Sequence, residues 1–122
     1  MSVVAVIGAS TDRRKFGNKA LRAFRAQGYT VLPINPHEQE IEGERAYASV
    51  LDYAGVIDEA TFYVPPSVGL QVIDEVVRKG IQVVWLNPGA DGPLVIARAH
   101  ALGIRPRVAC SILGIGDSPA AY

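Results

Sequence analysis

The densest group of residues able to bind an anion follows the first apolar run of the chain. It is the stretch Gly8-Ala9-Ser10-Thr11-Asp12-Arg13-Arg14-Lys15. Its glycine and alanine let the backbone turn sharply and approach a ligand closely, and its hydroxyls add donors. A helical pattern follows, whose first amides are free and carry partial positive charge. These features suit a pyrophosphate, with Arg13 or Lys15 paired to its oxygens; the alternative is a solvated basic loop before a helix.

A second candidate loop, Pro33-Ile34-Asn35-Pro36-His37, follows the next apolar run. Its two prolines preset the backbone around Asn35, so the loop can form a rigid wall for an adenine or a ribose. The alternative is an ordinary exit from a strand. A sheet that binds NAD usually carries Asp or Glu at this point for the ribose hydroxyls, and here the first acid is Glu38. We expect His37 to be exposed and to lie outside the site.

The third candidate loop is smooth and apolar. It reads Tyr63-Val64-Pro65-Pro66-Ser67, and its prolines provide no amide hydrogens. Such an edge suits an extended, uncharged chain better than a phosphate. The alternative is that the stretch only starts a helix, with Ser67 as its N-cap.

The fourth candidate loop contains the turn signal Asn87-Pro88-Gly89 after the apolar run that ends Trp85-Leu86. Asn87 either donates to a carbonyl of a ligand or stabilises the turn. We expect Trp85 to belong to the core of the strand.

No constellation of residues indicates catalysis or a metal. Cys110 is the single cysteine and is expected to behave as a small apolar side chain, while His100 reads as a surface residue of a helix. There is no metal-ligand spacing, no nucleophile elbow and no paired acid set. The residues themselves therefore predict a protein that is not an enzyme, with no catalytic and no metal-binding residue.

The elements that must position these loops repeat one pattern: a helical segment, a glycine, then a short apolar run. Glycine ends a helix at low cost, and strands that are apolar throughout are typical of parallel sheets covered by helices. The pattern predicts an α/β fold, a Rossmann-like doubly wound sheet of five parallel strands in the order 3-2-1-4-5. The predicted strands are 3–7, 30–34, 60–64, 82–86 and 105–109; the predicted helices are 16–27, 67–79, 92–102 and a short one near 47–54.

Length and composition limit the possible partners and compartments. The 122 residues, 49% of them apolar, suit one domain over 1–122. Twelve basic and twelve acidic residues balance, so no overall field favours nucleic acid or an anionic membrane. No apolar stretch approaches the roughly 20 residues that span a bilayer. One cysteine allows no internal disulfide, which makes a reducing cytoplasm the expected compartment.

Taken together, the four loops resemble a known family. The matching stretches are Val6-Ile7-Gly8-Ala9-Ser10, Gly28 to Pro36, Phe62-Tyr63-Val64-Pro65-Pro66 and Val84-Trp85-Leu86-Asn87-Pro88-Gly89. In this order and spacing they look like the small stand-alone CoA-binding domain proteins, which are similar to the nucleotide-binding domain of the succinyl-CoA synthetase α subunit. The resemblance covers nearly the whole chain, from Val3 to about Cys110.

The resemblance implies a role for each loop. The first would cradle the phosphates of CoA, the second would lie along the adenosine, and the third would flank the pantetheine arm. The family often has glutamine where Asn87 stands, Asp-Arg-Cys at Val108-Ala109-Cys110 and Ser-Tyr at Phe16-Gly17. The synthetase carries its phosphorylated histidine on a further domain that these 122 residues do not include, so the resemblance does not imply ligase activity.

The function expected from the sequence is therefore non-catalytic binding of coenzyme A or an acyl-CoA, with a protein partner or a homo-oligomer left open. One alternative is an NAD(P)-binding, oxidoreductase-like module, against which the missing acid after the second strand counts. The other alternative is an interaction module whose pocket is vestigial.

Overall fold

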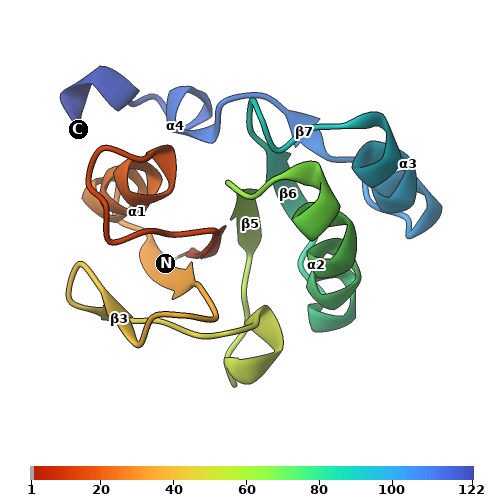
Figure 1. Cartoon of the computed structure of the whole chain (residues 1–122), viewed down its shortest axis with the longest axis horizontal. Coiled ribbons are helices and arrows are strands. Elements are labelled where there is room, and N and C mark those ends of the chain that lie inside the picture. The colour runs from red at the N-terminus through yellow and green to blue at the C-terminus, as the bar shows by residue number, and fades with distance from the viewer. Residues whose placement is uncertain (1) are drawn as a thin grey trace.

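Five parallel strands form the main sheet of the computed structural model, which describes residues 2–122 (Figure 1). In spatial order they are β2 (Thr30–Ile34), β1 (Val3–Ile7), β5 (Glu59–Phe62), β6 (Val83–Leu86) and β7 (Arg107–Val108). A separate antiparallel hairpin pairs β3 (Glu40–Ile41) with β4 (Glu44–Arg45). The parallel, Rossmann-like class predicted from the sequence is confirmed.

Helices cover both faces of the sheet. They are α1 (Phe16–Ala26), α2 (Pro66–Lys79), α3 (Pro93–Ala101) and α4 (Ser111–Gly114), with 3₁₀ turns η1 (Val50–Asp52) and η2 (Pro119–Ala121). Gly28, Gly80 and Gly103, which follow the three long helices, have φ of +92°, +87° and +86°, as the repeating pattern predicts. Within residues 2–122, no helix is both long and apolar enough to cross a membrane.

The start of α2 differs from its prediction. Ser67 is not the N-cap, because the helix begins one residue earlier and Pro65 occupies the cap position. Pro66 then stands in the first turn, where its missing amide hydrogen costs no hydrogen bond and its fixed φ already suits a helix. The proline pair therefore starts this helix without help from a side-chain cap.

Alternate residues of the central strand face the two helical layers. Val4 and Val6 pack in one core with α1 and with Ile112 of α4. Ala5 and Ile7 pack in a second core that contains residues of α2 and α3. All four strand residues are at most 2% exposed, which explains why the strand is apolar on both faces.

The predicted strand order is wrong. Numbered along the chain, the five main-sheet strands run 2-1-3-4-5, whereas 3-2-1-4-5 was expected. The outer edge of β2 is already occupied, because Tyr47 accepts from the amide of Asn35 and donates to the carbonyl of Pro33, both at 2.9 Å. The segment after β2 thus fills the position predicted for the third strand. That strand, β5, instead pairs with the other side of β1.

The register places the carboxyl ends of the main strands at one level. Ile7 is paired with Ile34 and with Phe62, and Phe62 is paired in turn with Leu86. Since these are the last residues of their strands, the four candidate loops all emerge along one edge of the sheet. This is the edge at which open α/β sheets bind ligands.

Candidate functional site

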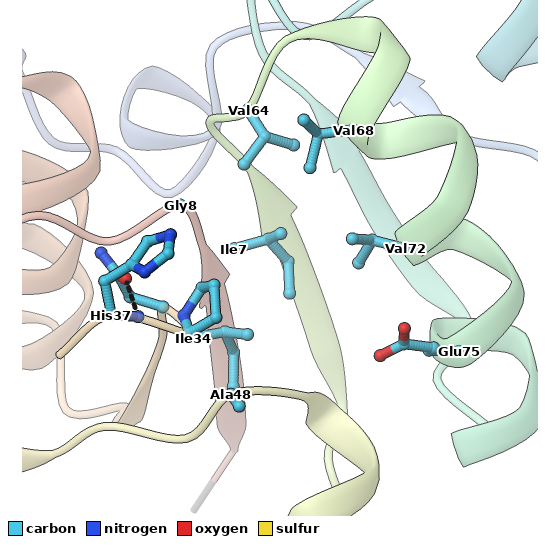
Figure 2. A pocket seen from close by; sticks show the side chains of 11 residues that line it. Ile7, Gly8, Ile34, His37, Ala48, Val64, Val68, Val72 and Glu75 are labelled. Carbon is cyan, nitrogen blue, oxygen red and sulfur yellow. Dashed lines mark hydrogen bonds between the residues drawn. The ribbon is translucent and has the colours of Figure 1, made fainter. Parts of the chain in front are cut away.

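A cavity of about 260 Å³ lies at this edge, between the exit of β2 and helix α2 (Figure 2). Its wall is mostly apolar and combines the ends of β1, β2 and β5 with one face of α2. Its volume lies below the roughly 300–1,000 Å³ typical of pockets for whole drug-sized ligands, so it suits one flat group of a longer molecule. The lining residues are Ile7, Gly8, Ile34, Asn35, Pro36, His37, Ala48, Val64, Val68, Val72 and Glu75.

Two asparagine side chains hold the loop that follows β1. Asn18 of α1 is fully buried, and its Nδ2 donates to the carbonyl of Ser10 at 2.8 Å. Asn35 donates from its Nδ2 to the carbonyl of Ala9 at 2.9 Å. These bonds occupy two loop carbonyls and preset the backbone, which lowers the entropy lost when an anion binds.

Two glycines bring this loop into direct contact with its neighbours. A Cβ on Gly8 would lie 2.6 Å from the carbonyl oxygen of Tyr63, and Gly8 has φ of +84°. A Cβ on Gly17, in the first turn of α1, would lie 2.4 Å from the carbonyl oxygen of Gly8. The turn after β1 is therefore packed between the helix and the exit of β5, and neither position has room for a side chain.

The basic cluster of the loop is largely neutralised by acids of the same region. Arg14 forms two side-chain hydrogen bonds with the Asp12 carboxylate, which lower the pKa of Asp12 to about 2. Arg13 lies 3.7 Å from a carboxylate oxygen of Glu42. Among the described residues, no carboxylate lies within 4.0 Å of the Lys15 amine, so Lys15 is the cation of this cluster that is free to meet a phosphate.

The side chain of Asn87 forms its hydrogen bonds within the protein and has none left facing a ligand. Its side chain is 1% exposed, and its Nδ2 donates to Thr61 Oγ1 at 2.7 Å and to the carbonyl of Phe62 at 2.8 Å. Its Oδ1 accepts from the amide of Ser111 at 2.8 Å. Of the two roles that the sequence left open, the geometry favours a structural one, because the amide joins β5, β6 and the start of α4.

A second, smaller cavity of about 180 Å³ lies on the other side of the β5 exit. Phe16, Tyr63, Asn87, Pro88 and Cys110 line it. The hydroxyl of Tyr63 lies 3.0 Å from Ser111 Oγ. The third loop was predicted to form one apolar edge, but its residues line two different cavities. Val64 lines the larger cavity and Tyr63 lines the smaller one.

Burial raises the pKa of Tyr63 to about 12. An unfolded tyrosine loses its proton near pH 10, so above that pH ionisation favours the unfolded chain. We expect the wild type to lose up to about 2–3 kcal/mol through this group between about pH 10 and 12, a loss that Tyr63→Phe lacks. Urea unfolding of both proteins at about pH 8 and pH 11.5 measures the difference. Parallel losses in the two proteins would contradict the assignment.

The structure brings together only some of the residues predicted from the sequence. Gly8, Ile34, Asn35, Pro36 and Val64 line the larger cavity, whereas Tyr63 and Asn87 line the smaller one. The remaining predicted residues line neither: Ala9, Ser10, Thr11, Arg13 and Lys15 form the loop beside the larger cavity, Pro33 is buried in β2, and Pro65 and Pro66 begin α2.

Sequence reasoning missed Asn18, Glu75 and the apolar face of α2. The expectation that His37 lies outside the site is wrong, because His37 lines the larger cavity beside Pro36. A polar residue within an amphipathic helix gives no local sign that it faces inward. The spacing of Val68, Val72 and Glu75 does place them on one face of a helix, and that signal was available.

A parallel sheet, a close-packed glycine turn before a helix and a cavity at the carboxyl edge define a nucleotide-binding α/β domain of the Rossmann-like class. Comparison with known families agrees: residues 2–114 match the family model described as the CoA binding domain. The chain therefore belongs to the CoA-binding domain family.

Relatives of this chain include parts of larger enzymes. An α subunit of the ADP-forming acetate–CoA ligase II from Pyrococcus furiosus is 38% identical over 88 residues, which are 70% of this chain and 19% of that protein. A conserved hypothetical protein from P. furiosus has a similar structure, with a TM-score of 0.85, 33% identity and coverage of 93% of this chain and 99% of that one. A dinucleotide-forming acetyl-coenzyme A synthetase from Ca. Korarchaeum cryptofilum matches with a TM-score of 0.75 and 32% identity, over 86% of this chain and 25% of that one.

Proposed function

We propose that this domain binds coenzyme A or an acyl-CoA and does not itself transform it. The observation that carries the proposal is the joint position of the glycine turn and the apolar cavity on one edge of the sheet. An anion-binding turn beside a slot for a flat ring matches a nucleotide. Membership of the CoA-binding domain family supports coenzyme A as the nucleotide.

In this proposal each part of the ligand has its own contact. The amides and hydroxyls of Ser10 and Thr11, with Lys15, hold the phosphates. The cavity bounded by Ile34, Pro36 and α2 holds the adenine. The exit of β5 then guides the pantetheine arm toward the smaller cavity. Since a chain with one cysteine forms no internal disulfide, a cytoplasmic location suits the proposal.

The absence of turnover is a separate part of the proposal. Several relatives are named as ADP-forming acetate–CoA ligases, and this chain spans 19% of the length of one of them and 11% of the length of another. The three asparagines near the proposed site, Asn18, Asn35 and Asn87, hold loops and strands in place. Hydrolysis of an acyl-CoA by the pure protein, lost on changing one residue, would contradict this part.

Competition calorimetry with CoA, NADP and NAD tests the ligand. We expect CoA to bind most tightly, because it has a ribose phosphate that NAD lacks and an arm that suits an apolar edge. Lys15→Ala should lower the affinity for CoA by about tenfold, because one good charge-assisted hydrogen bond contributes about that much. The loss of affinity should be smaller at high salt, because salt screens the charge of Lys15.

Arg14→Ala is the matched control, because Arg14 is already paired with Asp12 and should change the affinity little. NADP binding as tightly as CoA would favour the oxidoreductase-like alternative. Binding of none of the three at millimolar concentration would favour a vestigial pocket.

A further inference from the structure

One carboxylate stands in the otherwise apolar wall of the larger cavity. Glu75 projects from α2, one turn after Val72, toward the side formed by Ile34 and Ala48 (Figure 2). It is the single acidic residue among those that line this cavity. Placing a carboxylate against apolar surface is costly unless something there hydrogen-bonds to it.

Only one oxygen of this carboxylate is used within the protein. Ser49 donates from its hydroxyl to Glu75 Oε1, and Ser49 is itself fixed because its Oγ accepts from the amide of Leu51. Among residues 2–122, no side chain or amide donates to Glu75 Oε2. The carboxylate is therefore held in one orientation and keeps one acceptor for a ligand.

The shape of the cavity indicates which kind of group would donate to that oxygen. Pro36 and Ile34 line one side of the cavity and Val68 and Val72 of α2 line the other, so both sides offer apolar surface to a planar ring. Gly8, the first residue of the loop after β1, also lines this cavity. A ring bound in the cavity is therefore next to the loop that is proposed to hold the phosphates of the same nucleotide. The atom that meets Glu75 then lies on the edge of the base.

We propose that Glu75 determines the specificity of the base by accepting a hydrogen bond from the exocyclic amine of adenine. The inference rests on the proposed coenzyme A function and adds a recognition residue to it. An acceptor bonded to an amine favours adenine over a purine without that amine, because the analogue leaves the carboxylate with an unmet acceptor. Guanine also carries amine and ring N–H donors, so a guanine nucleotide belongs in the test.

The experiment uses calorimetry with three nucleotides, each a 3′,5′-bisphosphate: adenosine, purine riboside without the amine, and guanosine. For the wild type we expect adenosine to bind on the order of tenfold more tightly than purine riboside. Glu75→Leu should reduce that preference to within about twofold, since the leucine side chain has no hydrogen-bond acceptor for the amine. Thermal unfolding checks that the variant remains folded.

Asp74→Asn is the matched control, because it removes the same charge from the neighbouring position while Asp74 pairs with Arg98 outside the cavity. It should keep the full preference for adenosine. A wild type that binds adenosine and purine riboside equally, or a Glu75→Leu variant that keeps the preference, would overturn the role of Glu75 and leave the coenzyme A proposal standing. Failure to bind the adenosine nucleotide, or tighter binding of guanosine, would instead count against the coenzyme A proposal and this inference with it.

Discussion

Gly8→Ala is expected to lower the free energy of unfolding by about 2–5 kcal/mol and to remove ligand binding. A left-handed backbone costs a residue with a Cβ roughly 1–2 kcal/mol, and overpacking against fixed atoms adds typically 1–3 kcal/mol. At Gly8 both apply, since φ is +84° and the new Cβ would lie 2.6 Å from a backbone oxygen. Urea unfolding measures the loss, and calorimetry with CoA under folding conditions measures binding.

Gly28→Ala provides the matched control for this substitution. Gly28 has φ of +92° but no atom within 4 Å of the position of a new Cβ. Gly28→Ala should therefore lower the free energy of unfolding only by the cost of the left-handed backbone, about 1–2 kcal/mol, and leave the affinity for CoA unchanged. Equal losses at the two positions would show that the contact with Tyr63 contributes nothing.

The second large effect is expected for Asn87→Ala, at about 2–4 kcal/mol of lost stability. The change leaves the carbonyl of Phe62 and the amide of Ser111 without their present partners. Each buried polar group left without a hydrogen bond costs about 1–3 kcal/mol. The carbonyl of Phe62 and the amide of Ser111 belong to segments that the side chain of Asn87 holds together. Urea unfolding again provides the measurement.

The same variant separates the two roles considered for Asn87. If the side chain only joins β5, β6 and α4, stability falls and the CoA affinity of the remaining folded protein changes little. A variant with wild-type stability and a clear loss of affinity would show instead that Asn87 serves the ligand. Pro88→Ala is the control for stability alone, because it alters the next, exposed residue of the turn and keeps the amide of Asn87, while Pro88 itself lines the smaller cavity.

Local sequence signals determined the elements and the edge that carries the site. The helices at 16–27, 67–79 and 92–102 were predicted within a residue or two, because apolar spacing and a following glycine act over one or two turns. The prediction was less accurate for the short elements. The helix expected near 47–54 is the 3₁₀ turn Val50–Asp52, the strand expected at 105–109 is only Arg107–Val108, and the β3–β4 hairpin was not predicted.

The candidate site was predicted as loops, and the structure sorted those loops into contacts. Parallel strands end at one edge, so listing the residues after each strand was enough to find Gly8, Asn35 and Val64. The pairing of Arg13 with Glu42 could not be read in the same way, because the two residues are joined only by the packing of the hairpin near α1. Charge counted along the chain therefore overstated the free charge of the loop.

By itself, the sequence determined a parallel α/β sheet, its three long helices, its turn glycines and the group of loops that could bind a nucleotide. All of these depend on residues close together in the chain. Only the tertiary structure decided the order of the strands, the structural role of Asn87 and the place of Glu75 in the cavity wall. Each of these depends on which distant segments meet: the segment around Tyr47 occupying the edge of β2, the start of α4 meeting β6, and Ser49 lying against α2.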